Sequence, residues 1–150
     1  VAYVAVGVAS SADWASTAPG TVTVPRYAEV TLPDTFTSTA GAQGIASAWK
    51  APTNGLTKAL VKAEIWVDTA PTAGSITVDL HRNGTTVFTG GTNRPVIATS
   101  STSDVSGSPS VTTMSDGDLF QFQVDALNAS DQGNVGRLFC RIYWTEQVAL

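Results

Sequence analysis

The single histidine of the chain, His81, is the side chain best suited to acid–base chemistry near neutral pH. Asp79 lies two residues before it on the same face of an alternating segment, and serines are abundant, so a Ser-His-Asp site is one hypothesis. His81 directly precedes an Asn-Gly turn, however, which predicts an exposed position without protection from water. No Gly-x-Ser-x-Gly motif occurs either. We therefore expect a surface histidine and a protein that is not an enzyme.

Two carboxylates, Asp116 and Asp118, flank Gly117 and form the next candidate site. A calcium site needs further oxygen ligands, and no EF-hand loop pattern follows them. Acid and base carboxylates of a glycosidase lie on opposite sides of the substrate, whereas these two lie side by side. Asp and Gly favour turns, so we expect a turn into the next strand. Neither a His/Cys cluster for zinc nor a nucleotide-binding glycine motif occurs, and we expect no metal and no cofactor.

The composition excludes several further classes of protein. Charged residues make up 13% of the 150 residues, against about 25% in an average domain. Their place is taken by 21 Thr, 14 Ser and 13 Gly. The net charge is −4 and no basic block occurs, so nucleic acid is not an expected partner. No apolar run approaches the roughly 20 residues that span a bilayer, so no membrane partner is expected.

The elements that must position any site are β-strands. Residues 58–68 alternate with period two over the whole segment. This pattern predicts one inward face, consisting of Ala59, Val61, Ala63, Ile65 and Val67. Similar patterns predict strands over 1–8, 21–32, 75–82, 119–126 and the segment from 138, in which Cys140 is expected to be buried and inert. Pro25 predicts an edge strand or a bulge, and Asn83-Gly84 predicts a type I′ hairpin with residues 85–89.

About eight strands without a convincing helix predict one all-β domain over residues 1–150, an antiparallel sandwich or barrel. Two long loops among short ones favour Greek-key connections. The apolar segment within residues 1–20 is a candidate docking strand or arm.

Aromatic residues form the most informative group, because the alternation places several of them on the polar faces of their strands. Trp66 falls with Lys62 and Glu64, and Phe139 and Tyr143 fall with two arginines. We consider three explanations: loops cover these rings, the rings form a subunit interface, or they contact sugar rings. The low surface charge favours the interface, because burying Thr and Ser costs less than burying Lys and Glu. The residues expected at the interface are Trp66, Phe139, Tyr143, Arg137 and Arg141.

Two segments resemble a known family. The run AEIWVDTAPTAGSITVDLHRNGTTVFTGGTNRPVIA (residues 63–98) and the later MSDGDLFQFQVDAL (114–127) are similar to small jelly-roll domains of tailed-bacteriophage structural proteins. The resemblance covers about residues 58–146 and lies in turn and strand motifs. It implies a jelly-roll-like sandwich of the kind found in head decoration proteins, head fibres and tail-fibre modules, which are often trimers.

The expected function is therefore that of a virion structural protein, of the capsid decoration or head-fibre type, which is assembled in the host cytoplasm and acts by protein–protein adhesion. Its expected partners are copies of itself, as a homotrimer, and other virion proteins such as the major capsid protein. The alternative is a tail-fibre module that binds a receptor or a host-surface glycan. A third hypothesis, an enzyme that uses Asp116 and Asp118 as acid and base, has the least support from the sequence.

Overall fold

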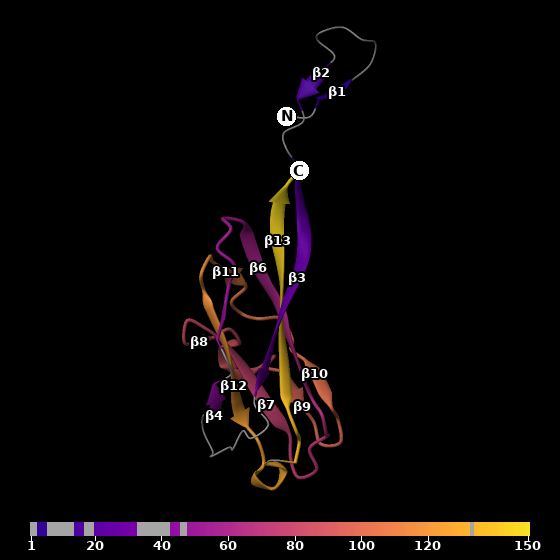
Figure 1. Ribbon diagram of the computed structural model, residues 1–150, viewed down its shortest axis with the longest axis vertical. Helices are drawn as coiled ribbons and strands as arrows, with labels where there is room; N and C mark the ends of the chain where they lie inside the picture. The colour runs from indigo at the N-terminus through magenta and orange to yellow at the C-terminus, as the bar shows by residue number, and fades with distance from the viewer. Residues whose placement is uncertain (1–2, 6–13, 17–19, 33–42, 46–47, 133) are drawn as a thin grey trace.

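The computed structural model describes residues 3–5, 14–16, 20–32, 43–45, 48–132 and 134–150 (Figure 1). In chain order the strands are β1 (Tyr3–Ala5), β2 (Trp14–Ser16), β3 (Thr21–Leu32), β4 (Gln43–Ile45), β5 (Trp49–Lys50), β6 (Thr57–Val67), β7 (Ile76–Arg82), β8 (Thr85–Thr86), β9 (Val96–Ile97), β10 (Ser103–Val105), β11 (Thr113–Met114), β12 (Leu119–Ala126) and β13 (Leu138–Ala149). The described residues otherwise hold two short 3₁₀ turns, η1 (Thr89–Gly91) and η2 (Ala129–Asp131), so the all-β prediction is confirmed.

Two antiparallel sheets pack together, and β1 pairs with β2 separately. The first sheet has the order β10-β6-β13-β3, and β11 also pairs with β6. The second sheet has the order β4-β12-β7-β8, with β5 on β12 and β9 on β7. Of the expected strand over residues 1–8, the structure describes Tyr3–Ala5; the other residues of the candidate docking arm lie largely outside the described part.

Several short strands share one position in a sheet. β4 and β5 lie along one edge of β12, β8 and β9 along one edge of β7, and β10 and β11 along one edge of β6. In the described part of the chain the two sheets therefore contain eight strand positions. We number these positions 1 to 8 in the order in which the chain reaches them, starting from β3 as position 1 and ending at β13 as position 8. In these numbers the first sheet has the order 6-3-8-1 and the second sheet the order 2-7-4-5. The chain thus crosses repeatedly from one sheet to the other, and each sheet has four strand positions. This is the arrangement of a jelly roll.

The core lies between the sheets and consists of the inward side chains of every second residue. In β13, Leu138, Cys140 and Ile142 are fully buried, and β7 and β12 face them with residues such as Leu80 and Phe122. Burial raises the pKa of the Cys140 thiol because it disfavours the thiolate. The predicted burial of this cysteine is confirmed. In the hairpin between β7 and β8, Asn83 and Gly84 both have positive φ, as a type I′ turn requires.

The predicted inward face of β6 is correct from Ala63 onward and wrong before it. The β13 register steps from Lys62 opposite Tyr143 to Leu60 opposite Trp144, so Val61 is an extra residue in β6. This bulge reverses the alternation in the first part of the strand. Leu60 is therefore 2% exposed, whereas Val61 is 44% exposed. The reversal also turns Lys58 into the interior, where the alternation alone predicts an outward lysine.

β3 is the edge strand of the first sheet and pairs with β13 along its whole length, from Thr21 opposite Ala149 to Leu32 opposite Leu138. Pro25 is tolerated in it because an edge strand needs hydrogen bonds on one side only. The edge prediction from Pro25 is confirmed. Pairing between β6 and β13 stops at Thr57 opposite Gln147, so β3 and β13 continue as a two-stranded ribbon at the end where the C terminus lies (Figure 1).

Candidate interaction surface on the outer face of the first sheet

Three rows of side chains cross the outer face of the first sheet from β3 through β13 to β6. The rows are Tyr27, Tyr143 and Lys62; Glu29, Arg141 and Glu64; and Thr31, Phe139 and Trp66. They point outward because β13 alternates strictly between buried and half-buried residues over this part of its length. We call these nine residues, together with Arg137 and Asp68, the outer-face ladder.

The third row is held by stacking between aromatic rings. Trp66 and Phe139 lie directly opposite each other, with ring centroids 5.4 Å apart and ring planes inclined by 7°. The Arg137 guanidinium lies 5.0 Å from the Phe139 ring centroid, and that of Arg141 lies 5.0 Å from the Trp66 ring centroid. Cations over aromatic faces are attracted by the ring quadrupole. The rings and the two arginines therefore form one continuous layer.

Arg141 is the centre of the ladder. Its Nε donates to Glu29 Oε1 at 2.9 Å, and its second terminal nitrogen also contacts Glu29. The other terminal nitrogen donates to the Tyr143 hydroxyl at 2.9 Å and lies 3.5 Å from Glu64. The hydrogen bonds to Tyr143 and Glu29 raise the pKa of Arg141 above its ordinary value. This guanidinium is thus positively charged and held in one orientation between two carboxylates.

Tyr143 completes this network by donating from its hydroxyl to Glu64 Oε2 at 2.5 Å. The hydrogen bond from Arg141 lowers the pKa of Tyr143, but the bond to Glu64 and partial burial outweigh it, so the pKa lies above its ordinary value. Lys62 lies over the same ring, 4.6 Å from its centroid. The first two rows are therefore joined through one neutral phenol.

Arg137 extends the ladder beyond the start of β13. Its Nε and one terminal nitrogen reach the two oxygens of Asp68 at 3.0 and 3.3 Å, a bidentate pair. The side-chain hydrogen bond from Arg137, with a second from its backbone N–H, lowers the pKa of Asp68. Both partners are well exposed, so this pair contributes little to stability and chiefly orients Arg137.

The ladder carries no net charge. Three cations, Lys62, Arg137 and Arg141, are matched by three carboxylates, which are Glu29, Glu64 and Asp68. Tyr27, at the edge strand, is 62% exposed, and its ring centroid lies 6.2 Å from that of Tyr143. A surface of this kind combines aromatic rings and arginines, the side chains enriched in protein interfaces, with charges that balance.

All five residues predicted at an interface, Trp66, Phe139, Tyr143, Arg137 and Arg141, belong to this one surface. β10 and β11, which lie in the long segment between β9 and β12, pair with β6 and extend the sheet instead of crossing its face. Sequence reasoning missed Tyr27. The alternation of the strand places Tyr27 on the same face as Glu29, which is a sign that could have identified it. Pro25 interrupts the pattern and obscured this sign.

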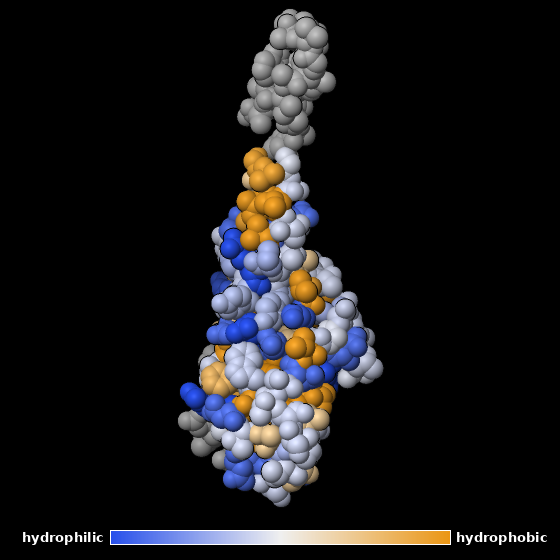
Figure 2. Space-filling model, turned by 90° about the vertical axis from the view of Figure 1, so that its right-hand side faces the viewer, coloured by the Kyte–Doolittle hydropathy of each residue, from blue (hydrophilic) through white to orange (hydrophobic). Residues whose placement is uncertain are grey.

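A second exposed apolar area lies at the end of the β3–β13 ribbon, where hydrophobic residues gather (Figure 2). Val22 is 41% exposed and Leu150 is 81% exposed, and the backbone N–H of Leu150 donates to the Gly20 carbonyl at 2.8 Å. Val22 lies opposite Val148, on the face of the sheet that forms the core further along.

The structure brings Asp79 and His81 together but corrects the predicted exposure. His81 Nε2 lies 3.2 Å from Asp79 Oδ2, and the histidine side chain is only 24% exposed. Asp79 is buried, and it also binds Arg94 at 3.0 Å and accepts from the Thr86 hydroxyl at 2.7 Å. Arg94 in turn binds Asp125 at 2.6 Å. The histidine is therefore part of a polar network on the second sheet that includes Asp79, Arg94 and Asp125.

Asp116 and Asp118 lie in the predicted turn, where Gly117 has a φ of +79°. Asp118 accepts from the Ser115 backbone N–H at 2.8 Å and from the Asn83 side chain at 2.7 Å. Asp116 faces other partners, the Lys58 ammonium and the Gly55 backbone N–H. Among the described residues no three His, Cys, Asp or Glu side chains converge as metal ligands would, and no helix is long and apolar enough to cross a bilayer.

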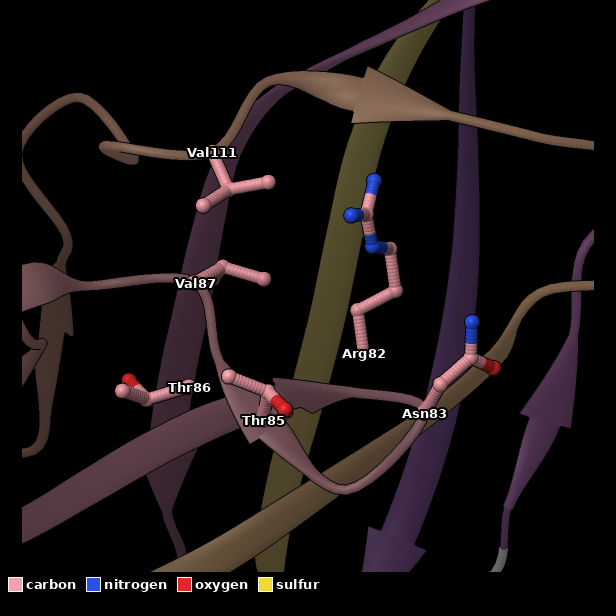
Figure 3. A pocket seen from close by; sticks show the side chains of 6 residues that line it. All are labelled: Arg82, Asn83, Thr85, Thr86, Val87 and Val111. Atoms are coloured by element: carbon pink, nitrogen blue, oxygen red, sulfur yellow. The ribbon is translucent and has the colours of Figure 1, made fainter.

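A small hollow of about 220 Å³ lies beside the β7–β8 hairpin (Figure 3). Val87 and Val111 point towards the Arg82 side chain in it, and Asn83, Thr85 and Thr86 complete its lining. The Arg82 guanidinium is engaged by the Thr113 carbonyl and lies 3.9 Å from Asp118. The cation is thus already used within the protein, and the hollow is less suited to a ligand than the outer-face ladder is to a protein surface.

Comparison with known proteins finds no family model that matches the chain and no curated protein that is similar to it.

Proposed function

We propose that this chain is a structural protein of a bacteriophage particle, of the capsid decoration or head-fibre type, which acts by protein–protein adhesion in the virion after assembly in the host cytoplasm. Its partners are copies of itself, as a homotrimer, and other virion proteins such as the major capsid protein. The support is the jelly-roll order of the strands, together with the resemblance of residues 63–98 and 114–127 to phage structural domains.

The single observation that carries the adhesion role is the outer-face ladder. Its aromatic rings and arginines lie on three adjacent strands, and its charges are balanced within the surface. A partner that covers such a surface removes few unpaired charges from water, so the desolvation cost is low. Arg141 is already fixed by Glu29 and Tyr143, so little side-chain entropy is lost on binding.

A second candidate function, a tail-fibre module that binds a receptor or glycan, is favoured by Tyr27. Its ring is 62% exposed, and the carboxylate of Glu29 lies two residues away on the same strand. Sugars bind proteins through an aromatic ring against the pyranose face and carboxylates on the hydroxyl groups. The ladder lies on the outer face of a sheet, however, and small-molecule sites are usually concave, so we place adhesion between proteins first.

Light scattering of the purified chain over a range of concentrations tests the proposal. We expect a trimer mass for the wild type and a monomer mass for Tyr27→Glu, because this substitution removes an exposed ring and gives the ladder a net negative charge. Val96→Glu is the matched control: Val96 is also exposed but lies on β9 in the second sheet, and its variant should remain trimeric. A wild type that stays monomeric at every concentration contradicts self-association. Glycan-array binding that Tyr27→Glu abolishes would favour the second function.

A further inference from the structure

Lys58 is fully buried at the end of the sandwich from which the β3–β13 ribbon extends. Its side chain is 0% exposed, and the ammonium contacts Asp116 Oδ1 and donates to the Leu56 carbonyl at 3.2 Å. The bulge at Val61 places it there. A buried ammonium is costly, and a single carboxylate seldom offsets its desolvation. The Lys58 nitrogen has thus lost its contact with water and lies against an oxygen of the Asp116 carboxylate.

Asp116 is held so that its two oxygens have different surroundings. Oδ1 faces the lysine nitrogen, whereas Oδ2 accepts the Gly55 backbone N–H at 2.7 Å. A backbone donor on one carboxyl oxygen is the arrangement that stabilises the negative charge of a tetrahedral intermediate. The turn that contains Gly117 thus holds the Asp116 carboxyl group against the amine, with Oδ1 towards the nitrogen.

Glu146 is the third member of the group. It lies directly opposite Lys58 in the β6–β13 register, and both side chains point inward and are 4% exposed as residues. Directly opposite residues on one face have Cβ atoms about 5 Å apart. Glu146 is fixed by Arg26 at 3.1 Å, Asn54 at 3.3 Å and the Trp144 indole at 3.2 Å. Burial raises the pKa of Glu146, but these hydrogen bonds outweigh it and keep the group ionised.

We propose that Lys58 and Asp116 condense into an intramolecular amide bond, with Glu146 as the proton carrier. The Nζ–Cγ bond forms and the Cγ–Oδ1 bond breaks. Lys58 loses two protons, both of which reach Oδ1 by way of Glu146, so Oδ1 leaves as water and Glu146 returns to its starting state. No oxidant or other reactant is needed.

The surroundings favour this condensation in two ways. Contact between the amine and the carboxyl group makes the reaction intramolecular, with the large effective concentrations that such geometry gives. The product is neutral, so the charge of a fully buried ammonium, whose partner Asp116 is 31% exposed, is removed from the interior. The bond would join β6 of the first sheet to the turn before β12 of the second. It would tie the two sheets together covalently in a chain whose single cysteine cannot form an internal disulfide.

Intact mass measurement of the purified, denatured chain tests the proposal. We expect the wild type to be lighter than its sequence by one water, and a protease digest to contain a branched peptide that joins Lys58 to Asp116. Asp116→Ala should have the full mass. A wild type of full mass after prolonged incubation of the folded protein would overturn the proposal.

The matched control is Lys58→Arg, which keeps the positive charge but supplies no amine nucleophile. It is needed because Asp116-Gly117 can also lose water by closing a cyclic imide, which requires no lysine. Loss of water that persists in Lys58→Arg contradicts the amide bond. Glu146→Gln, which retains the hydrogen-bonding shape, should slow condensation at least tenfold while circular dichroism shows an unchanged fold. An unchanged rate in this variant would overturn the role assigned to Glu146.

Discussion

Trp66 and Phe139 lie opposite each other on neighbouring strands and stack almost in parallel, with ring centroids 5.4 Å apart. Residues 73 positions apart thereby form the apolar part of a surface that Arg137 and Arg141 extend. The pair stabilises the sheet and at the same time keeps two large rings on its outer face.

Replacing either ring by leucine should remove the stacking while keeping apolar area. Aromatic pairs contribute about 0.5–1.5 kcal/mol beyond the area that they bury. A double-mutant cycle with Trp66→Leu and Phe139→Leu, measured by urea unfolding, should therefore give a coupling free energy in that range. A coupling near zero would show that the two rings are only neighbours.

The bulge in β6 predicts opposite effects at two adjacent residues. Leu60→Ala should lower the free energy of unfolding by about 2–5 kcal/mol, because it removes a buried side chain beside Trp144. Val61→Ala should change it by less than about 0.5 kcal/mol, because Val61 faces solvent. Denaturant titration of both variants distinguishes the bulge from an unbroken strand, for which the order of the two effects would be reversed.

Gly84 and Gly136 both have positive φ, but only Gly136 lies close to another residue. Alanine substitutions at the two positions therefore distinguish the cost of backbone strain from the cost of a steric clash. A Cβ at Gly84 would meet nothing within 4 Å, so Gly84→Ala should cost only the left-handed conformation, about 1–2 kcal/mol. A Cβ at Gly136 would lie 2.8 Å from Asp68 Cβ, so Gly136→Ala should cost clearly more. It should also disturb the Arg137–Asp68 pair. Thermal unfolding of the two variants tests this order, and equal losses would contradict the close approach at Gly136.

Asp131 predicts a loss of stability in acid. Its buried carboxylate accepts the backbone N–H groups of Thr72, Ala73 and Gly74, at 2.8 to 3.2 Å, and so holds the turn between β6 and β7. The hydrogen bond from Thr72, with help from the other two, lowers the pKa of Asp131. A lowered pKa in the folded state means that this stabilisation is complete above the unfolded-state value of about 3.9 and is lost as the pH falls below it.

Asp131→Asn should therefore be less stable than the wild type at pH 7 and should lose less stability on acidification. Melting temperatures of both proteins between pH 7 and pH 3 measure this difference. Parallel curves would contradict the role given to Asp131. Other carboxylates with lowered pKa values, such as Asp68 and Asp116, are present in both proteins and serve as a common background.

Much of the fold follows from local patterns in the chain. The alternation in β13 and the Asn83-Gly84 turn each predict the observed element, because side-chain period and turn conformation depend on neighbouring residues. The alternation failed at Val61, because a bulge arises from how two strands pair and leaves no local signal. The local pattern likewise does not show the network around His81, because Arg94, which also binds Asp79, comes from a different loop.

The sequence by itself determined the all-β class, the polar faces that carry Trp66, Phe139 and Tyr143, and a surface low in charge. Only the tertiary structure decided which residues meet. Glu29, Glu64 and Arg141 come from three strands far apart in the chain, and strand pairing places them in one row. Lys58, Asp116 and Glu146 are likewise brought together only by strand pairing and by the packing of the two sheets. Their chemistry depends on register and burial, and both exist only once the two sheets have packed together.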